Sequence, residues 1–478
     1  MTAGHGVLRG LARRVALGRR FVLAGRSVLA GRFVLAGRSV LAGRSVLAGR
    51  CPLAAARWRL AHMPSFVERG AIAVLLLLSA PGFVTRPSSL AAQEPGASLR
   101  ISVLTFGQGN AVFERFGHNA LRVQDTATGL DLAYNWGMFS FEQPNFLGRF
   151  LSGDTQYWVE AFPTPFLLQV YAEQDRQSVE QVLALTPAQR LEIATFVAAN
   201  AREANKYYRY DYFRDNCSTR LRDALDRVLG GSLKRRFEPI TTEWSYRNES
   251  VRLTREDGLA QAGIDVALGP RADIPITAWE SMFIPMRLRD LLRDVTVPTL
   301  DGPAVPLVAE ERVLYEAKRL PELPERRGLS IGAWGPVLGA WMFLLAPVGV
   351  IARRRTRIPA AIMVALFYGV TGLVGVVLIG MWVGSSHVFW YNNLNLLLFS
   401  PFALLAAVPA ARAILIGKVG SRTKGLVLAV LGGAVLALLL SAVVNQRLMG
   451  PILLALPAHI GLAVLVWRHT RPRAAATP

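Results

Sequence analysis

Long apolar stretches occupy much of the last third of this 478-residue chain. They lie near residues 332–352, 358–384, 394–411, 425–443 and 451–467. A transmembrane helix needs about 20 mostly apolar residues to cross the hydrocarbon core of a bilayer. The sequence therefore predicts an all-α bundle of about five transmembrane helices over residues 332–468.

The basic residues between these stretches predict how the bundle is oriented. Lys and Arg gather after the first, third and fifth stretches, at Arg353, Arg354, Arg355, Arg357, Arg412, Lys418, Arg422, Lys424, Arg468, Arg471 and Arg473. The loop after the second stretch has none, and the loop after the fourth has only Arg447. Cytoplasmic loops are enriched in Lys and Arg. We therefore expect residues 469–478 to form a cytoplasmic tail and the preceding soluble region to lie outside the cytoplasm.

The first 92 residues are expected to contribute nothing to the working fold. From Arg20 the hexamer RFVLAG or RSVLAG recurs five times, which favours a recent tandem duplication or a start codon placed too early. Translation from Met63 would instead give an apolar run and small residues before Gln93, as in a secretory signal. The run is too short for an uncleaved membrane anchor. Residues 1–62 are therefore predicted to be a non-functional or untranslated leader, and residues 63–92 a signal sequence.

The net charge of +21 does not indicate a nucleic-acid partner. Residues 1–62 carry twelve arginines and no acidic residue, which leaves about +9 (21 − 12) for the rest of the chain. Much of that remainder flanks the apolar stretches, and no basic surface motif interleaved with aromatics appears. The charge is thus accounted for by the leader and by membrane topology.

Residues 96–325 have the mixed composition of a soluble α+β domain. Alternating apolar residues predict strands at residues 99–106, 119–125 and 130–136. A helix is expected to begin after Thr186, with Pro187 at its first position. A last polar helix is predicted over residues 308–320, followed by a linker at 321–328.

Cys217 is the main candidate for chemistry in this domain. The only other cysteine, Cys51, lies in the leader, so the mature chain would hold one unpaired thiol in an oxidising compartment. Asp215 or Asn216 is expected to cap a helix that begins at Cys217. The positive end of that helix, with Arg220 nearby, would favour a thiolate nucleophile.

His118 is the histidine available to this thiol within residues 96–325. It would take the thiol proton and return it to a leaving group. A neighbouring strand would supply a third, orienting group, with Asn135 favoured over Tyr134 and Asp131. The alternative interpretation also stands, in which Cys217 packs as a small apolar side chain and His118 is a hydrogen-bonded core residue.

Several motifs resemble those of the Lnb-type bacterial lipoprotein N-acyltransferases. The matching stretches are RFGHNALRV, AYNWGMFSF, FLGRFLSGDTQYWV, YYRYDYFRDNCSTRLRD and LGPRADIPITAWESMFIP, in this order and followed by membrane helices. The resemblance covers roughly residues 97–310, and more loosely the membrane part. It implies a circularly permuted papain-like, NlpC/P60-like fold, with Cys217 as nucleophile and His118 as base.

The resemblance also implies a reaction. Cys217 would take an acyl chain from a membrane phospholipid as a thioester and pass it to the N-terminal amine of a diacylglyceryl-modified lipoprotein. The implied location is the bacterial inner membrane, with the catalytic domain on the periplasmic side. Tyr134, Asn216 and Arg220 are predicted to line the substrate site.

A second polar cluster lies in the loop SSHVFWYNNLNLL, on the same side of the membrane as the soluble domain. We expect His387 and Asn395 to contact substrate, whereas Trp390 and Tyr391 are ordinary interfacial anchors. No cofactor is predicted, because no glycine-rich phosphate loop precedes a helix in the soluble domain. No metal site is predicted either, because His118, His387 and His459 are too scattered.

Two other functions remain open. The same Cys217 and His118 could serve a cysteine peptidase or amidase that acts on peptidoglycan or peptides. A non-catalytic membrane scaffold with a degenerate domain would instead tolerate the loss of Cys217.

Overall fold

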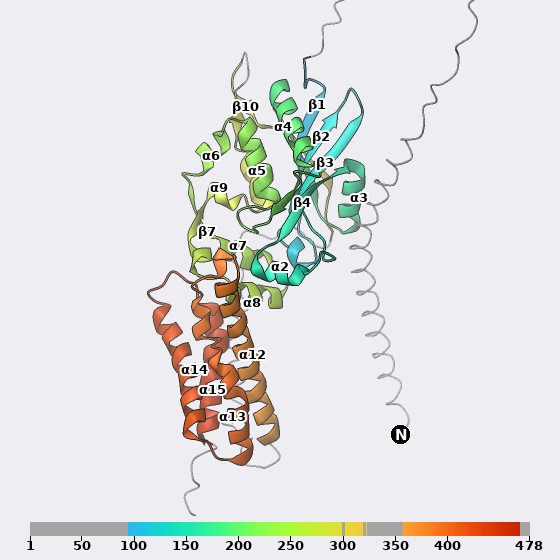
Figure 1. Cartoon of the computed structure of the whole chain (residues 1–478). Helices are drawn as coiled ribbons and strands as arrows, with labels where there is room; N and C mark the ends of the chain where they lie inside the picture. The colour runs from blue at the N-terminus through green and yellow to red at the C-terminus, as the bar shows by residue number, and fades with distance from the viewer. Residues whose placement is uncertain (1–93, 299–301, 319–321, 323–356, 469–478) are drawn as a thin grey trace, which may run out of the picture. The chain divides into compact units, whose positions relative to one another are not determined.

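The computed structural model describes residues 94–298, 302–318, 322 and 357–468 (Figure 1). The predicted leader, signal sequence, linker, first apolar stretch and cytoplasmic tail all lie wholly or mostly outside these residues.

An antiparallel sheet organises the N-terminal domain. Within the described residues its seven strands are β1 (Leu99–Phe106), β2 (His118–Asp125), β3 (Leu130–Met138), β4 (Gln156–Pro163), β5 (Ser178–Leu183), β6 (Tyr207–Arg209) and β11 (Val308–Tyr315). Their order across the sheet is β11-β5-β1-β2-β3-β4-β6. β1 and β2 lie near the centre of the sheet, and their pairing places Phe106 opposite His118. The three predicted strands correspond to β1, β2 and β3.

Helices cover both faces of this sheet. The domain's helices are η1 (Val112–Glu114), α2 (Phe146–Ser152), α3 (Thr164–Glu173), α4 (Pro187–Asn200), α5 (Cys217–Val228), α6 (Ser232–Phe237), α7 (Tyr246–Leu253), α8 (Gly258–Ala267), η2 (Pro270–Asp273), α9 (Ala278–Ser281) and α10 (Pro285–Leu292). α4, α5 and α10 pack on one face, and α3 contacts β3 and β4. Short strand pairs complete the domain: β7 (Thr241–Ser245) with β8 (Pro275–Thr277), and β9 (Thr296–Val297) with β10 (Val305–Pro306).

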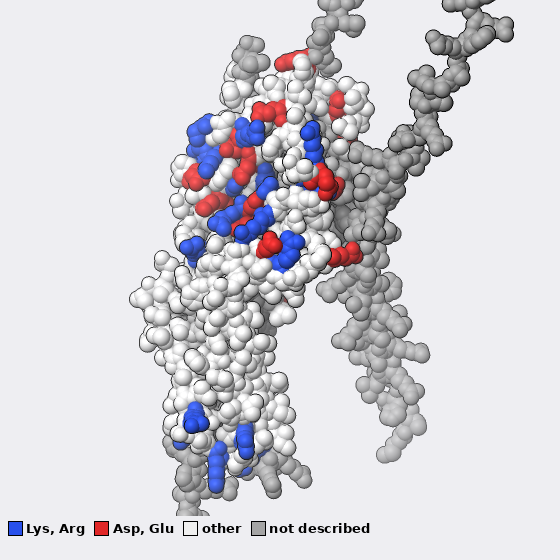
Figure 2. Space-filling view, in the orientation of Figure 1, with Lys and Arg blue, Asp and Glu red and all other residues white. Residues whose placement is uncertain are grey.

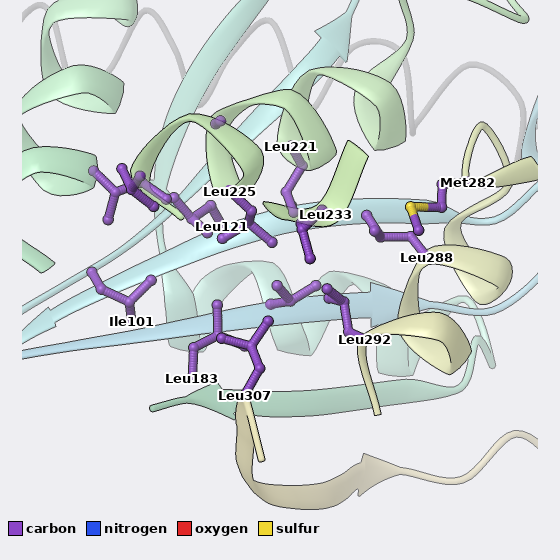
Figure 3. Packing of buried hydrophobic residues seen from close by; sticks show 14 of the residues in the cluster. Ile101, Leu121, Leu183, Leu221, Leu225, Leu233, Met282, Leu288, Leu292 and Leu307 are labelled. Atoms are coloured by element: carbon purple, nitrogen blue, oxygen red, sulfur yellow. The ribbon is translucent and has the colours of Figure 1, made fainter. Parts of the chain in front are cut away.

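The main hydrophobic core lies between the sheet and α5 and α10 (Figure 3). Ile101 and Leu121 from the sheet meet Leu221 and Leu225 of α5, and these four side chains are fully buried. The hydrophobic effect fixes α5 against the sheet, since burying a leucine side chain contributes about 1.5–3 kcal/mol. This packing holds the N-terminus of α5 next to the strands.

The helix predicted over residues 308–320 is wrong, because residues 308–315 form the edge strand β11. β11 pairs with β5 from Val308↔Leu183 to Tyr315↔Ser178. Its charged side chains form salt bridges with neighbouring elements: Glu310 with Arg100, at 3.0 Å, and Glu311 with Arg293. Tertiary pairing at the open edge of β5 therefore overrode a helix-like sequence pattern.

The C-terminal part is a helix bundle. Among the described residues, four segments are long and apolar enough to cross a membrane: Arg357–Gly384, Leu394–Ile416, Ser421–Leu440 and Met449–Trp467. They contain α12 (Arg357–Gly384), η6 (Leu394–Leu397) with α13 (Phe402–Ile416), α14 (Ser421–Leu440) and α15 (Met449–Arg468), with η5 (Val388–Trp390) between α12 and η6. The visible face of the bundle carries Lys and Arg only at one end (Figure 2). The expected sheet domain followed by apolar helices is thus confirmed, while the described residues do not test the count of five.

Candidate active site

Cys217 is the first residue of α5. Asn216 caps this helix, because its Oδ1 accepts hydrogen bonds from the backbone N–H groups of Ser218 and Thr219, both at 2.9 Å. Its amide nitrogen donates to the carbonyls of Tyr212 (3.0 Å) and Phe283 (2.9 Å). Of the two expected caps, Asn216 is therefore the one used. Cys217 itself is a buried free thiol.

His118 opens strand β2, directly after a tightly packed glycine. Gly117 has φ +78°, and a Cβ there would lie 2.8 Å from both the Phe106 carbonyl oxygen and the Met286 sulfur. Glycine adopts this backbone conformation without steric cost. The turn at Gly117 thus fixes the position of the His118 backbone, from which the imidazole projects.

Asn135 on β3 orients the imidazole. The Asn135 Nδ2 group donates to the Ala133 carbonyl at 2.9 Å, so Oδ1 is left as the acceptor that faces His118. His118 Nε2 lies 3.2 Å from that oxygen. The hydrogen-bond network therefore assigns the imidazole proton to Nε2 and leaves Nδ1 free to accept a proton.

The thiol lies beside the start of β2. The backbone N–H of Asn119, the residue after His118, hydrogen-bonds toward the Cys217 sulfur. The Asn119 side chain donates to the Ser218 hydroxyl at 3.1 Å, which ties β2 to α5. On β3, Gly137 adopts φ +89° where the β3–β4 register shifts, and a Cβ there would lie 3.5 Å from the Cys217 Cβ. The structure thus gathers Cys217, His118 and Asn135 at one corner of the sheet.

Burial makes both reactive groups neutral. It lowers the pKa of His118 to about 4, helped by the positive charge of Arg176 and opposed by the Asn135 hydrogen bond. His118 keeps some exposed surface, but its ring stacks near Phe106 and Tyr171, which removes water from it. Burial also raises the pKa of the Cys217 thiol, although backbone N–H groups and Arg176 oppose this change. The thiol of Cys217 and the imidazole of His118 are therefore both neutral.

This electrostatic state corrects the expected thiolate. The N–H groups at the start of α5 do favour the thiolate, but desolvation outweighs them. Arg220 is engaged elsewhere, since it binds both carboxylate oxygens of Asp215 at 2.6 and 2.9 Å and stacks on the Tyr208 ring. The positive charge of Arg176 also favours the thiolate, but less than burial disfavours it.

Comparison with known protein families gives two matches, one for each part of the chain. Residues 88–248 match the Lnb N-terminal periplasmic domain, and residues 330–471 match the Lnb transmembrane domain. The chain belongs to the Lnb family. It is accordingly a multi-pass membrane protein with a periplasmic domain. No curated protein and no solved structure matches it.

Arg176 is a residue of this candidate site that the sequence did not indicate. It lies in the turn between α3 and β5 and is buried, with its Nε donating to the Gly107 carbonyl at 2.9 Å. Its guanidinium lies over the Tyr171 ring at 4.7 Å and is 3.9 Å from a carboxylate oxygen of Glu114. Only the sheet order reveals it, because β5 lies beside β1 and brings this turn next to Gly107.

Two of the alternatives to Asn135 are placed away from His118. Asp131 binds Arg122 through two hydrogen bonds, at 2.8 and 2.5 Å. Tyr134 points into the main core on the α5 side of the sheet, where it is buried. Of the three candidates for the orienting group, Asn135 is the one that contacts the imidazole.

The two membrane-loop residues join the domain to the helices of this Lnb-family protein. His387 Nε2 donates to the Phe150 carbonyl at 2.7 Å, and its ring stacks on Tyr212. Asn395 is fully buried and donates to the Val266 carbonyl of α8 at 2.9 Å. Neither bond reaches Cys217 or His118, so substrate binding by His387 or Asn395 stays a prediction. Among the described residues, no group of three or more His, Cys, Asp or Glu side chains could hold a metal.

Proposed function

We propose that this protein is a thiol acyltransferase that moves an acyl chain from a membrane phospholipid to the N-terminal amine of a diacylglyceryl-cysteine lipoprotein. The observation that carries the proposal is the Cys217, His118 and Asn135 arrangement in a periplasmic domain attached to membrane helices. The fold we propose for that domain is the permuted papain-like one, since the histidine strand precedes the cysteine helix along the chain.

The first half-reaction acylates the enzyme. The Cys217 sulfur attacks the ester carbonyl while its proton passes to His118 Nδ1. The tetrahedral oxyanion would be stabilised by N–H groups at the start of α5 and by the Asn119 N–H. The carbon–oxygen ester bond then breaks, and His118 returns the proton to the lysophospholipid oxygen. The product is a Cys217 thioester.

The second half-reaction transfers the acyl chain. The lipoprotein amine attacks the thioester carbonyl, and His118 accepts the proton that the amine loses. The carbon–sulfur bond breaks, the thiolate takes the proton from His118, and an amide is formed. Asn135 holds the Nε2–H in place throughout, so that Nδ1 serves as the base in both halves. Water must be kept from the thioester, and the burial of Cys217 serves that purpose.

The test is the N-terminal mass of a reporter lipoprotein from cells that lack their own N-acyltransferase. The cells receive the unaltered chain, the Cys217→Ser variant or the His118→Ala variant. We expect a third acyl chain on the reporter amine only with the unaltered chain. A free amine in all samples, with each protein present in the membrane, would instead favour a peptidase, an amidase or a scaffold. Acylation by either variant would overturn the catalytic role of the residue that it lacks.

A further inference from the structure

α2 is a short helix that exposes apolar side chains. Leu147 is 67% exposed, Leu151 is 41% exposed and Phe150 is 38% exposed, and no residue of the helix is fully buried. The helix sequence FLGRFLS contains no acidic residue. A cluster of apolar side chains left in water is costly, and such clusters mark contact with a partner or a membrane.

The structure ties α2 to the outer end of a membrane helix. α12 ends at Gly384, and two residues later the Ser386 N–H donates to the Ser152 carbonyl of α2 at 2.9 Å. His387 donates to the Phe150 carbonyl at 2.7 Å. The last turn of α12 still exposes Trp382 and Val383, as expected where a membrane helix meets the lipid boundary. α2 therefore lies at the level where the outer leaflet ends.

A row of aromatic rings leads from α2 toward the thiol. Successive ring centroids are separated by 6.2 Å (Phe150–Phe146), 6.0 Å (Phe146–Phe139), 5.1 Å (Phe139–Tyr157) and 4.1 Å (Tyr157–Tyr210). Tyr210 and Cys217 both border Gly137, at 3.6 and 3.5 Å from the position of a Cβ on that glycine. This aromatic row is therefore continuous from the exposed helix to the candidate nucleophile.

We propose that α2 inserts Leu147, Phe150 and Leu151 among the lipid acyl chains of the outer leaflet, and that the aromatic row guides one acyl chain to Cys217. A short apolar helix at an interface buries its exposed side chains in lipid through the hydrophobic effect. The proposed insertion of α2 does not depend on any enzyme activity. The proposed guidance of an acyl chain, in contrast, rests on the proposed acyl transfer.

The insertion is tested with a nitroxide spin label on the full chain. Cys51→Ala and Cys217→Ala remove the two cysteines of the chain, and Leu151→Cys then places one label on α2. Leu191 on α4 is the matched control, because it is also 41% exposed. Each protein is placed in vesicles of phosphatidylethanolamine and phosphatidylglycerol, and label collisions with oxygen and with a water-soluble nickel complex are measured.

We expect the label at residue 151 to collide more with oxygen than with nickel, and the label at residue 191 to do the reverse. Nickel collisions at residue 151 as frequent as at residue 191 would overturn the insertion. Low collision rates with both reagents would also overturn it, because protein and not lipid would then cover α2. Leu147→Cys repeats the measurement at a second position, in case the first variant does not fold.

The guidance of the acyl chain is tested separately by activity. Phe146→Ala, which interrupts the aromatic row, should reduce acyl transfer from phospholipid vesicles by about tenfold, while Leu191→Ala should not. Equal rates in both variants would overturn the guidance. A lipid-exposed label at residue 151, together with no acyl transfer by the unaltered chain, would instead refute the proposed function and leave the insertion of α2 standing.

Discussion

Asn135 decides which nitrogen of His118 can act as the base. Without its amide the imidazole would lose the bond at Nε2 and could rotate or change tautomer. We expect Asn135→Ala to lower the rate of acyl transfer by about 10- to 100-fold, which is less than the roughly 100- to 10,000-fold that general acid–base catalysis contributes, because the imidazole itself remains. The measurement is the acylation rate of the reporter lipoprotein. Asn205→Ala, at an exposed amide on the surface, is the control; equal rates for the two variants would contradict the role of Asn135.

The lowered pKa of His118 predicts an unusual pH profile. The base must be neutral, and its pKa of about 4 keeps it neutral down to moderately acidic pH. Formation of the Cys217 thioester, the half-reaction that needs no amine, should therefore persist below pH 6.5, the ordinary histidine pKa, and fall only as the pH approaches 4. Arg176→Gln removes a charge that lowers this pKa, so the acid limb should move to higher pH, whereas Arg176→Lys should move it less. An acid limb near pH 6.5 in the unaltered chain would contradict the prediction.

The same shift affects stability at acid pH. The unfolded chain binds a proton at His118 as the pH falls below about 6.5, but the folded chain does not bind one until about pH 4. As the pH falls from 7 to 5, the free energy of unfolding should therefore decrease by about 2 kcal/mol from this residue alone. His118→Gln should lose less over that interval, which thermal unfolding of both chains in detergent would measure.

At this scale the sequence pointed to three residues of the candidate site and gave no sign of a fourth. Cys217 and His118 were identifiable because they are reactive residue types with few rivals in the soluble region, and Asn135 because it follows from strand order. The neutral state of the thiol was not predictable, because burial in the folded domain decides it. Arg176 was hidden since the fold alone brings its turn to the site.

Asn216 caps α5 and also ties the start of this helix to other segments. Asn216 accepts two backbone bonds at the start of α5 and donates to two carbonyls of other segments. Asn216→Ala should therefore lower the free energy of unfolding by about 2–4 kcal/mol. It should also slow acyl transfer, because Cys217 is the first residue of the helix. Thr186→Ala, at the cap of α4, should cost only about 1 kcal/mol and leave the rate unchanged. Equal melting temperatures for the two variants would contradict this difference.

Elements with strong local signals were predicted well, and those fixed by tertiary pairing were not. α4 begins after Thr186 as its capping pattern indicated, and the α5 face formed by Cys217, Leu221, Ala224 and Val228 is buried. β11 has no such signal, because its pairing with β5 joins residues more than 120 positions apart. The local periodicity of a sequence does not indicate which distant strand a segment will pair with.

Asn393 joins the two halves of the molecule through its buried side chain. Its amide nitrogen donates to the carbonyls of Val266 (2.8 Å) and Ala267 (2.9 Å) at the end of α8. Its oxygen accepts from the Asn395 N–H at 3.0 Å and from the Gln446 side chain at 2.8 Å. One side chain thus links α8 of the periplasmic domain to both outer loops of the membrane helices.

This linkage would hold Cys217 at a fixed height above the membrane, which in the proposed reaction supplies both donor and acceptor. Asn393→Ala leaves the Ala267 carbonyl without this partner, at about 1–3 kcal/mol for a buried group. The Val266 carbonyl keeps its bond from Asn395, and the Gln446 amide keeps its bond to the Leu268 carbonyl. We expect backbone amides of α8 to exchange hydrogen about 10- to 100-fold faster, with β1 and β2 unchanged, and acyl transfer to slow because the domain loses its fixed position. Hydrogen exchange of the full chain in detergent, with Asn205→Ala as control, measures this. Unchanged exchange in α8 would mean that the remaining contacts, such as the His387–Phe150 bond, hold the domain without Asn393.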